Sequence, residues 1–325
     1  MISAFDQIYG NHPLKNTMIK MLREKQLSHG YVFYGDEGIG KSLIVNTFIK
    51  GVLCQAPMSQ PCGACQSCRV LDLNNHPDLI RVTTEQKSIG VEVIREQVNR
   101  DIHIKPYGLY KIYVIDKAHT MTPSAQNALL KVLEEPPQYA MIILIADNLN
   151  QLLHTVRSRL TTLKVQPVTM AELNTYLQRT DRPHLQESFY LNYCGGNIGQ
   201  LERMLTDTHF AELRELAFQA ILQLEDLNLH QVFEFYQNIE EKRDEVETLI
   251  LFMTLILRDS LFIKEGDVSL INVDRQSDIA EYAAKLETEV VLGRIQTLYD
   301  TAELLRKNAN FQMTIELMLL KLRKT

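Results

Sequence analysis

Phosphate binding is indicated by one stretch of the chain, GDEGIGKS at residues 35–42, which matches the pattern G-x-x-x-x-G-K-[ST] at every position. In this pattern glycines let backbone N–H groups face phosphate oxygens, the lysine reaches the outer phosphates and the serine hydroxyl can ligate Mg²⁺. Apolar residues at 31–34 and at 43–53 flank the stretch, which predicts strand, loop and helix in that order. The sequence therefore predicts a nucleotide-binding loop, and the alternative is a turn of the same shape that binds nothing. The residues expected to make it are Gly35, Gly38, Gly40, Lys41 and Ser42.

Metal binding is indicated by four of the five cysteines, Cys54, Cys62, Cys65 and Cys68, which have the spacing C-x7-C-x2-C-x2-C. Two-residue gaps let neighbouring thiolates converge on one tetrahedral ion, and in a reducing compartment the pattern predicts a structural zinc module at 54–68. Because protein sulfur would fill every coordination position, no place is left for a reacting water. A disulfide pair and an iron–sulfur cluster are the alternatives. The fifth cysteine, Cys194, is predicted to be a buried apolar thiol.

The composition sets limits on the class of protein. Over 325 residues the chain is 45% hydrophobic and 23% charged, and its formal net charge is −6, which argues against a free-standing nucleic-acid binder. Its N-terminus has no signal-peptide pattern, and its longest apolar run, at 249–257, is about half of what a bilayer span needs. We expect a cytoplasmic protein with reduced thiols and no membrane association.

The elements that must position these residues differ between the two halves of the chain. Runs that predict strands occur in the first half, at 31–34, 79–82, 111–116, 141–145 and 163–165. Helical patterns separate them, including one that begins at Thr122-Pro123 and one over 91–98 for which Ser88 is the expected N-cap. Strands buried on both faces and alternating with helices predict an α/β domain, a five-stranded parallel sheet with helices on each side.

After Pro167 only helical patterns remain. Short helices are expected at 170–177, 186–194 and 200–205, and longer ones from about residue 208, for example at 245–262 and 288–306. We therefore predict three domains, at 1–166, 167–208 and 209–325.

Three features together resemble the AAA+ clamp-loader subunits of bacterial DNA polymerase III. They are the phosphate loop, the cysteine module behind it, and a strand ending in Asp116 that is followed by NALLKVLEEPP at 127–137. LSHG at 27–30, HPD at 76–78 and Ser158-Arg159 add to the likeness, which spans essentially the whole chain. Clamp loaders open the ring-shaped sliding clamp and place it on primed DNA. The resemblance implies an AAA+ domain, a small helical lid domain and an all-α collar domain, and the family has two zinc-bearing kinds of subunit, gamma/tau and delta-prime.

Three elements that the hydrolysing gamma/tau subunits use are altered here. Asp116 can hold Mg²⁺ through water, but Lys117 stands where the family has a glutamate that acts as general base, a loss worth about 10²–10⁴ in rate. Gly199 stands where a lid arginine would touch the γ-phosphate, and IADN at 145–148 replaces the usual paired threonines. The resemblance thus implies weak or structural nucleotide binding without efficient hydrolysis, and no complete active site.

One catalytic element of the family is retained in VRSRL at 156–160. In the family, the arginine at the position of Arg159 reaches into the neighbouring subunit's ATPase site as a trans arginine finger, a group that can be worth roughly 10³–10⁵ in rate. The alternative for Arg157 and Arg159 is a solvated basic turn.

The retained finger and the altered site together favour a delta-prime subunit of the DNA polymerase III holoenzyme. Its implied partners are the gamma/tau and delta subunits in a hetero-pentameric ring and, through the complex, the sliding clamp and primed DNA. The implied cofactors are structural Zn²⁺ and, where the loop is occupied, ATP or ADP with Mg²⁺. Two other functions remain open: an active ATPase subunit, against which Lys117 and Gly199 argue, and a stand-alone P-loop phosphotransferase with a zinc lid, for which residues after 166 offer no acceptor pocket.

Overall fold

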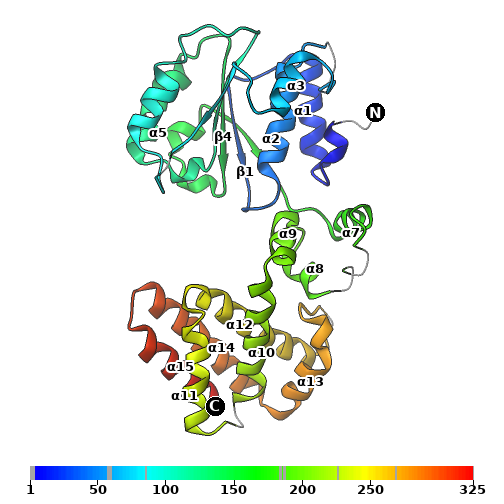
Figure 1. Cartoon of the computed structure of the whole chain (residues 1–325), viewed down its shortest axis with the longest axis vertical. Coiled ribbons are helices and arrows are strands. Elements are labelled where there is room, and N and C mark those ends of the chain that lie inside the picture. Colours follow the sequence, from blue (N-terminus) through cyan, green and yellow to red (C-terminus); the bar gives the residue numbers. More distant parts are fainter. Residues whose placement is uncertain are drawn as a thin grey trace. The chain divides into compact units, whose positions relative to one another are not determined.

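The computed structural model describes residues 4–56, 61–84, 86–182, 185, 188–224, 227–267 and 269–324. The chain forms two compact units, the first made of Met1–Tyr176 with Gly196–Gln200 and the second of Leu177–Gly195 with Leu201–Thr325 (Figure 1). Each unit has its own hydrophobic core. The division into three domains at 166 and 208 stays a prediction.

The first unit is built on a five-stranded sheet in the order β2-β3-β4-β1-β5, and every pairing in it is parallel. The strands are β1 (Gly30–Tyr34), β2 (Leu79–Val82), β3 (Lys111–Ile115), β4 (Ala140–Ala146) and β5 (Thr161–Lys164). The predicted parallel sheet is therefore confirmed, with strand ends that differ from the prediction by at most two residues.

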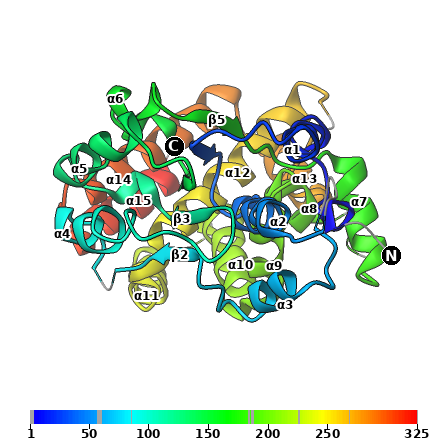
Figure 2. The same cartoon turned by 90° about the horizontal axis from the view of Figure 1, so that it is seen from above.

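Helices cover both faces of this sheet. The helices of this unit are α1 (His12–Glu24), α2 (Lys41–Leu53), α3 (Gln66–Asp72), α4 (Val91–Ile94), the π-helix Arg95–Asn99, α5 (Pro123–Glu134) and α6 (His154–Arg157), and α7 (Met170–Arg179) belongs to it up to Tyr176. The sheet separates α5 from α1 and α2 (Figure 1), and the view from above shows α4 and α5 on one side of it and α2 on the other (Figure 2).

Alternation along the strands produces these two faces. Tyr31 and Phe33 of β1 are fully buried and pack with Phe48 of α2, whereas Val32 between them belongs to the cluster that α5 covers. Because successive side chains of a strand point to opposite faces, a strand buried on both sides must be apolar at every position. This explains why the strand runs were readable in the sequence.

The predicted N-cap at Ser88 is wrong. Gly90 precedes α4, and Ile89 is held in an extended bridge in which its N–H donates to Thr120 O at 3.2 Å and its carbonyl accepts from Thr122 N at 3.0 Å. Ser88 lies before this bridge and therefore cannot cap the N-terminus of α4. The start predicted for a helix at residue 186 lies outside the described residues.

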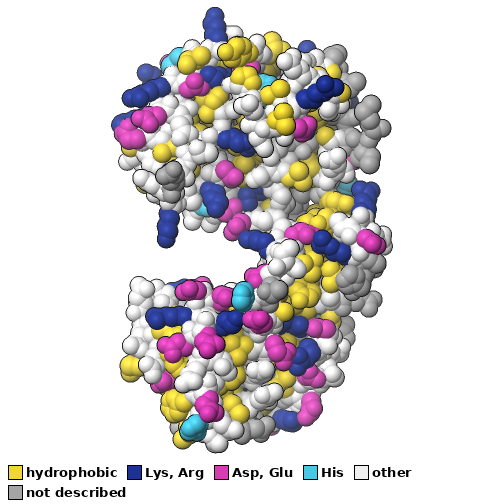
Figure 3. Space-filling view, in the orientation of Figure 1, with side chains coloured by type: hydrophobic (Ala, Val, Ile, Leu, Met, Phe, Trp, Pro, Cys, Tyr) yellow, Lys and Arg dark blue, Asp and Glu magenta, His cyan; other side chains and the backbone are white. Residues whose placement is uncertain are grey.

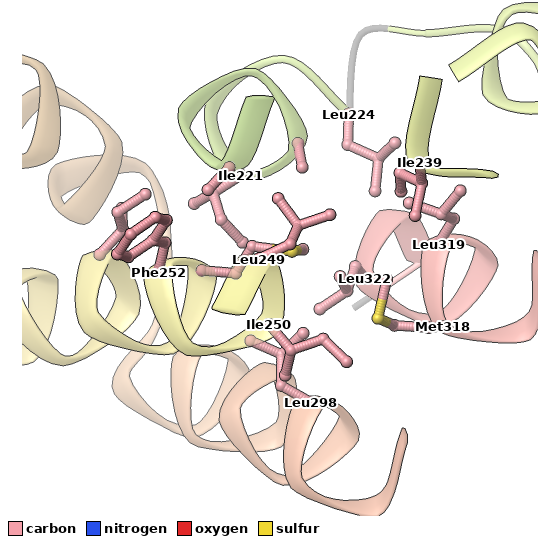
Figure 4. Close-up of a cluster of buried hydrophobic side chains, with 14 of the residues drawn as sticks. Ile221, Leu224, Ile239, Leu249, Ile250, Phe252, Leu298, Met318, Leu319 and Leu322 are labelled. Carbon is pink, nitrogen blue, oxygen red and sulfur yellow. The ribbon is translucent and has the colours of Figure 1, made fainter. Parts of the chain in front are cut away.

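The second unit is helical throughout the residues that the structure describes. Its helices are α8 (Phe189–Cys194), α9 (Ile198–Thr206, shared with the first unit), α10 (Thr208–Leu222), α11 (Leu229–Glu240), α12 (Val246–Lys264), α13 (Gln276–Lys285), α14 (Thr288–Arg306) and α15 (Phe311–Lys324). Side chains of α10, α11, α12, α14 and α15 converge on one core, where Leu249 and Leu298 are fully buried (Figure 4). Cys194 is buried as predicted, 3% exposed, and its Sγ lies 3.3 Å from Leu191 O.

Short 3₁₀ turns connect these elements, at Ala4–Gln7, Ala118–Thr120, Leu149–Gln151, Arg243–Glu245 and Val273–Arg275. On the face seen in Figure 3, basic and acidic side chains are interspersed over each unit. This mixture agrees with the mildly negative net charge of −6.

Candidate functional site

The phosphate loop runs from the end of β1 to the start of α2, as predicted. Its glycines have positive φ angles of 149° at Gly35, 87° at Gly38 and 90° at Gly40, and Gly40 is the N-cap of α2. At Gly35 a Cβ atom would also lie 2.4 Å from the carbonyl oxygen of Val165, so that glycine meets both a conformational and a steric requirement. The loop therefore has the backbone form that its sequence pattern requires.

Lys41 is almost fully enclosed by this loop and by the residue that follows β4. Its side chain is 7% exposed, and its Nζ donates to Gly35 O at 2.9 Å and to Asp36 O at 2.7 Å. The same Nζ lies 2.7 Å from Oδ1 of Asp147. The lysine that would meet the outer phosphates is thus paired with a carboxylate of the chain itself.

The register of the sheet brings Asp147 to this position. Strands β1 and β4 pair so that Tyr34 lies opposite Ala146, which places Asp147 beside Gly35 at the carboxyl edge of the sheet. Asp147 is also held by His119, because its N–H donates to His119 Nδ1 at 3.1 Å and its Oδ2 lies 3.4 Å from Nε2. From the sequence we identified Asp147 only as part of an altered segment and missed its pairing with Lys41. Predicting this pairing would have required knowing that β1 lies next to β4 with Tyr34 opposite Ala146.

The remaining predicted nucleotide residues, Ser42 and Asp116, are both exposed. Asp116 follows β3, two strands from β1, and its Oδ1 accepts the N–H of Lys117 at 2.8 Å. Lys117 is exposed and has a φ of 49°, so the side chain next to the strand-ending acid is a cation at the surface. At the carboxyl end of β3, the predicted Asp116 is therefore present, and the residue after it is a lysine and not a carboxylate.

The first turn of α9 packs directly on the phosphate loop. Gly199 N donates to Gly38 O at 3.0 Å, and Asn197 Nδ2 donates to Glu37 O at 2.7 Å. A Cβ atom on Gly199 would lie 2.4 Å from Gly38 O, which is closer than real Cβ contacts come. Any side chain at 199, an arginine included, is incompatible with this contact. The sequence marked Gly199 as a departure from the family pattern but did not predict the bond from Asn197 to the loop.

An apolar cavity of about 330 Å³ lies beside the loop, within the first unit. Tyr9 and Tyr176 form part of its wall and meet edge to face, with ring centroids 5.1 Å apart. Other lining residues are Ile8, Ile39, Leu43 and Ile198. A cavity with apolar walls beside a loop of backbone amides suits a ligand that joins a flat apolar ring to phosphate groups.

Arg159 lies on the surface just after α6, with 35% of its side chain exposed. Its Nη2 is 2.6 Å from Oε1 of Glu134, the last residue of α5, and its Nη1 donates to Thr155 O at 2.7 Å. Arg157, the other basic residue of this turn, has its Nη1 3.3 Å from Oδ1 of Asn150. A third, longer bond joins Arg159 Nη1 to Ser158 Oγ at 3.4 Å, so the guanidinium is ordered by three hydrogen bonds and still accessible from outside.

The four clustered cysteines meet at one point between α2 and α3. Their Sγ atoms all lie within 4.8 Å of one another, and the Cys54–Cys65 and Cys62–Cys68 pairs are each 4.0 Å apart. Sulfurs around a tetrahedral ion at about 2.3 Å would be about 3.8 Å apart, whereas a disulfide requires about 2.05 Å. All five cysteines are free thiols. The four are therefore placed to hold a metal ion.

Backbone N–H groups prepare this sulfur cluster for a cation. Cys65 N donates to Cys62 Sγ at 3.3 Å, and hydrogen bonds from the N–H groups of Ala64 and Cys65 lower the pKa of Cys62 to about 6. Burial instead raises the pKa of Cys68, the innermost thiol. A metal ion would offset that burial by stabilising the thiolate.

The cluster is tied to the sheet through Ser67 and His76. Ser67 Oγ donates to Leu53 O at 2.7 Å and lies 3.0 Å from His76 Nε2, while Asp78 N donates to His76 Nδ1 at 3.2 Å. Since Nδ1 accepts, the ring proton sits on Nε2 and points to the serine oxygen, so this serine is not activated as a nucleophile. Ser67 and His76 thus link the cysteine module to the start of β2 through hydrogen bonds.

Within the part of the chain that the structure describes, no helix has both the length and the apolar character that a membrane crossing requires.

Comparison with known proteins places these features in a family. A family model described as "DNA polymerase III, delta subunit" matches residues 10–169, and one described as "DNA polymerase III, delta subunit, C terminal" matches 208–324. DNA polymerase III subunit delta' of Bacillus subtilis is 29% identical over 316 residues, which is 93% of each chain. DNA polymerase III subunit tau of the same organism is 33% identical over 157 residues, 48% of this chain and 28% of that one.

Among solved structures, a gamma subunit-related protein of DNA polymerase III from Thermotoga maritima covers 96% of this chain and 99% of its own, with 16% identity and a TM-score of 0.44. The two delta-subunit models together match both the sheet-bearing and the helical part of the chain, and the delta' relative aligns along nearly all of it. By this match the chain belongs to the delta-prime family of the AAA+ clamp-loader subunits of DNA polymerase III.

Proposed function

We propose that this chain is a non-hydrolysing subunit of a cytoplasmic clamp loader, which helps to load the sliding clamp onto primed DNA. Its partners are gamma/tau and delta subunits in a hetero-pentameric ring, with helices 209–325 forming its share of a collar. The alignment with a delta' relative over 93% of both chains supports this role, as do the gamma/tau relatives of the first half.

Its own site binds ATP or ADP weakly, as a structural part, and does not turn it over efficiently. The observation that carries this proposal is the contact between Gly199 and Gly38, because a Cβ at 199 would lie 2.4 Å from Gly38 O and leaves no room for an arginine directed at the γ-phosphate. Lys117 supports it further, since a cation cannot take a proton from an attacking water. Asp116 and Ser42 are the groups that would face Mg²⁺.

Arg159 acts as a finger in the ATPase site of the neighbouring subunit. A planar guanidinium can spread its N–H donors over the charge that builds on a transferring phosphoryl group. The partial exposure of Arg159 and its place on a short turn between α6 and β5 support this assignment, because the side chain can reach outward without unfolding any element.

The four-cysteine cluster holds Zn²⁺ with a purely structural role. Four sulfur ligands, with no histidine or carboxylate joining them among the described residues, favour zinc over magnesium or calcium. The ion would fasten the end of α2 to the start of α3, a segment that otherwise has few apolar side chains.

The function is tested by ATP turnover of the purified full chain, alone and in a reconstituted assembly with gamma/tau and delta. The proposal expects negligible turnover by the chain alone and robust turnover by the assembly. Robust turnover by the chain alone would contradict it.

A further inference from the structure

The ammonium group of Lys41 has no hydrogen-bond donor left for a ligand. An ammonium carries three protons, and Lys41 Nζ has three acceptors at hydrogen-bond distance, Gly35 O, Asp36 O and Asp147 Oδ1. The Lys41 side chain is 7% exposed and the Asp147 side chain 32% exposed, so water screens this pair less than it screens a pair at the surface. The charge that would attract phosphate is already neutralised inside the site.

We propose that Asp147 is the residue that determines ligand specificity here. Its carboxylate takes the position at Lys41 that a phosphate oxygen would need, so that the phosphate groups of a nucleotide add little to binding. The site then recognises the nucleoside part of its ligand and discriminates poorly between adenosine and ATP. This inference rests on the nucleotide binding proposed above.

Asp147 is fixed in this role from two sides. Its backbone N–H is hydrogen-bonded to His119 Nδ1, and its second carboxylate oxygen lies 3.4 Å from His119 Nε2. It directly follows β4, whose residues are all buried. A phosphate would have to displace a carboxylate that the sheet edge holds in place, and two anions cannot share one lysine without mutual repulsion.

Besides the backbone N–H groups of the loop, the apolar cavity next to it remains for recognition. Tyr9, Tyr176 and Ile198 line it, and it is large enough for a purine ring. Stacking and burial of a flat ring against such walls do not depend on Lys41. Base recognition and phosphate recognition are therefore separable in this site.

The test is calorimetric titration of the full chain with adenosine and with ATP and Mg²⁺, in wild type and in Asp147→Asn. In wild type, ATP is expected to bind less than about tenfold more tightly than adenosine. Asp147→Asn keeps the shape of the side chain and removes its charge, and a regained charge-assisted bond to phosphate should raise ATP affinity about 10- to 100-fold without changing adenosine affinity. Asp147→Thr serves as a second variant, and thermal melting verifies that each is folded.

Two controls make the result specific. Asp72→Asn removes a carboxylate from another lysine of α2, Lys50, and is expected to leave both affinities unchanged. Lys41→Met added to Asp147→Asn should abolish the gain.

The inference is overturned if wild type already binds ATP more than about a hundredfold more tightly than adenosine, or if neither folded variant gains affinity for ATP. In the first case the nucleotide site itself still stands. If no variant binds either ligand, the proposed nucleotide site fails together with the inference, and the role of Arg159 is unaffected.

Discussion

Arg159 and Glu134 form an ion pair with 2.6 Å between Nη2 and Oε1, which joins the turn after α6 to the last residue of α5. A second bond from Nη1 to Thr155 O holds the other edge of the guanidinium. Half of the Glu134 side chain and about a third of the Arg159 side chain are exposed. The proposed finger is therefore held against its own subunit, and must leave Glu134 to meet a phosphate.

Weakening this pair should make the finger more available. Glu134→Gln removes the competing charge, and since exposed ion pairs are worth about 0.2–1 kcal/mol, turnover by the assembly is expected to rise by a factor of at most about five. Glu135→Gln, which removes the same charge one residue later, is the matched control and should have no effect. A fall in turnover with Glu134→Gln would mean that Glu134 positions the finger and does not compete for it.

The contact between α9 and the phosphate loop should not tolerate even one added methyl group. Gly199→Ala forces a Cβ to within 2.4 Å of a backbone oxygen, and overpacking of this kind costs about 1–3 kcal/mol in the free energy of unfolding. In Gly293→Ala the new Cβ meets nothing within 4 Å in the interior of α14, so that variant should be neutral or more stable. Denaturant unfolding measures both, and equal stability of Gly199→Ala and wild type would disprove the packing argument.

The cysteine cluster predicts one zinc ion per chain and a local effect of its loss. Cys68→Ser removes the innermost ligand, and we expect it to abolish zinc binding and to raise amide hydrogen exchange around 61–75 by about tenfold or more. Elemental analysis and exchange mass spectrometry test this, with Cys194→Ala as a control that should retain the metal because Cys194 lies in the other unit. A folded, metal-free wild-type chain would refute the assignment.

The sequence was sufficient where local pattern alone determines structure. Strands buried on both faces had to be apolar throughout, a proline at the first position marked the start of α5, and the cysteine spacing brought four sulfurs together as expected. The loop at 35–42 likewise required only its own glycines and the helix behind it.

The parts that could not be predicted depend on residues far apart in the sequence. The pairing of Lys41 with Asp147 needs the register of β1 against β4, and the contact of Gly199 with Gly38 needs a helix start to fold back on the loop. Ser88 failed as an N-cap because the next residue, Ile89, bridges to Met121, which no local pattern reveals. The apolar spacing over 91–98 predicted a helix there, but it could not distinguish the π-helix at Arg95–Asn99 from an α-helix.

We propose that this chain completes a neighbour's active site through Arg159, and ATP turnover by the reconstituted assembly with Arg159→Ala tests this role most directly. Turnover at the neighbouring site should fall by roughly 10³–10⁵, and Arg159→Lys should rescue little of it because a lysine lacks the planar fork of donors. Assembly of the complex, checked by gel filtration, should be unchanged. An assembly with Arg159→Ala that hydrolyses ATP as fast as wild type at that site would show that Arg159 is not the finger.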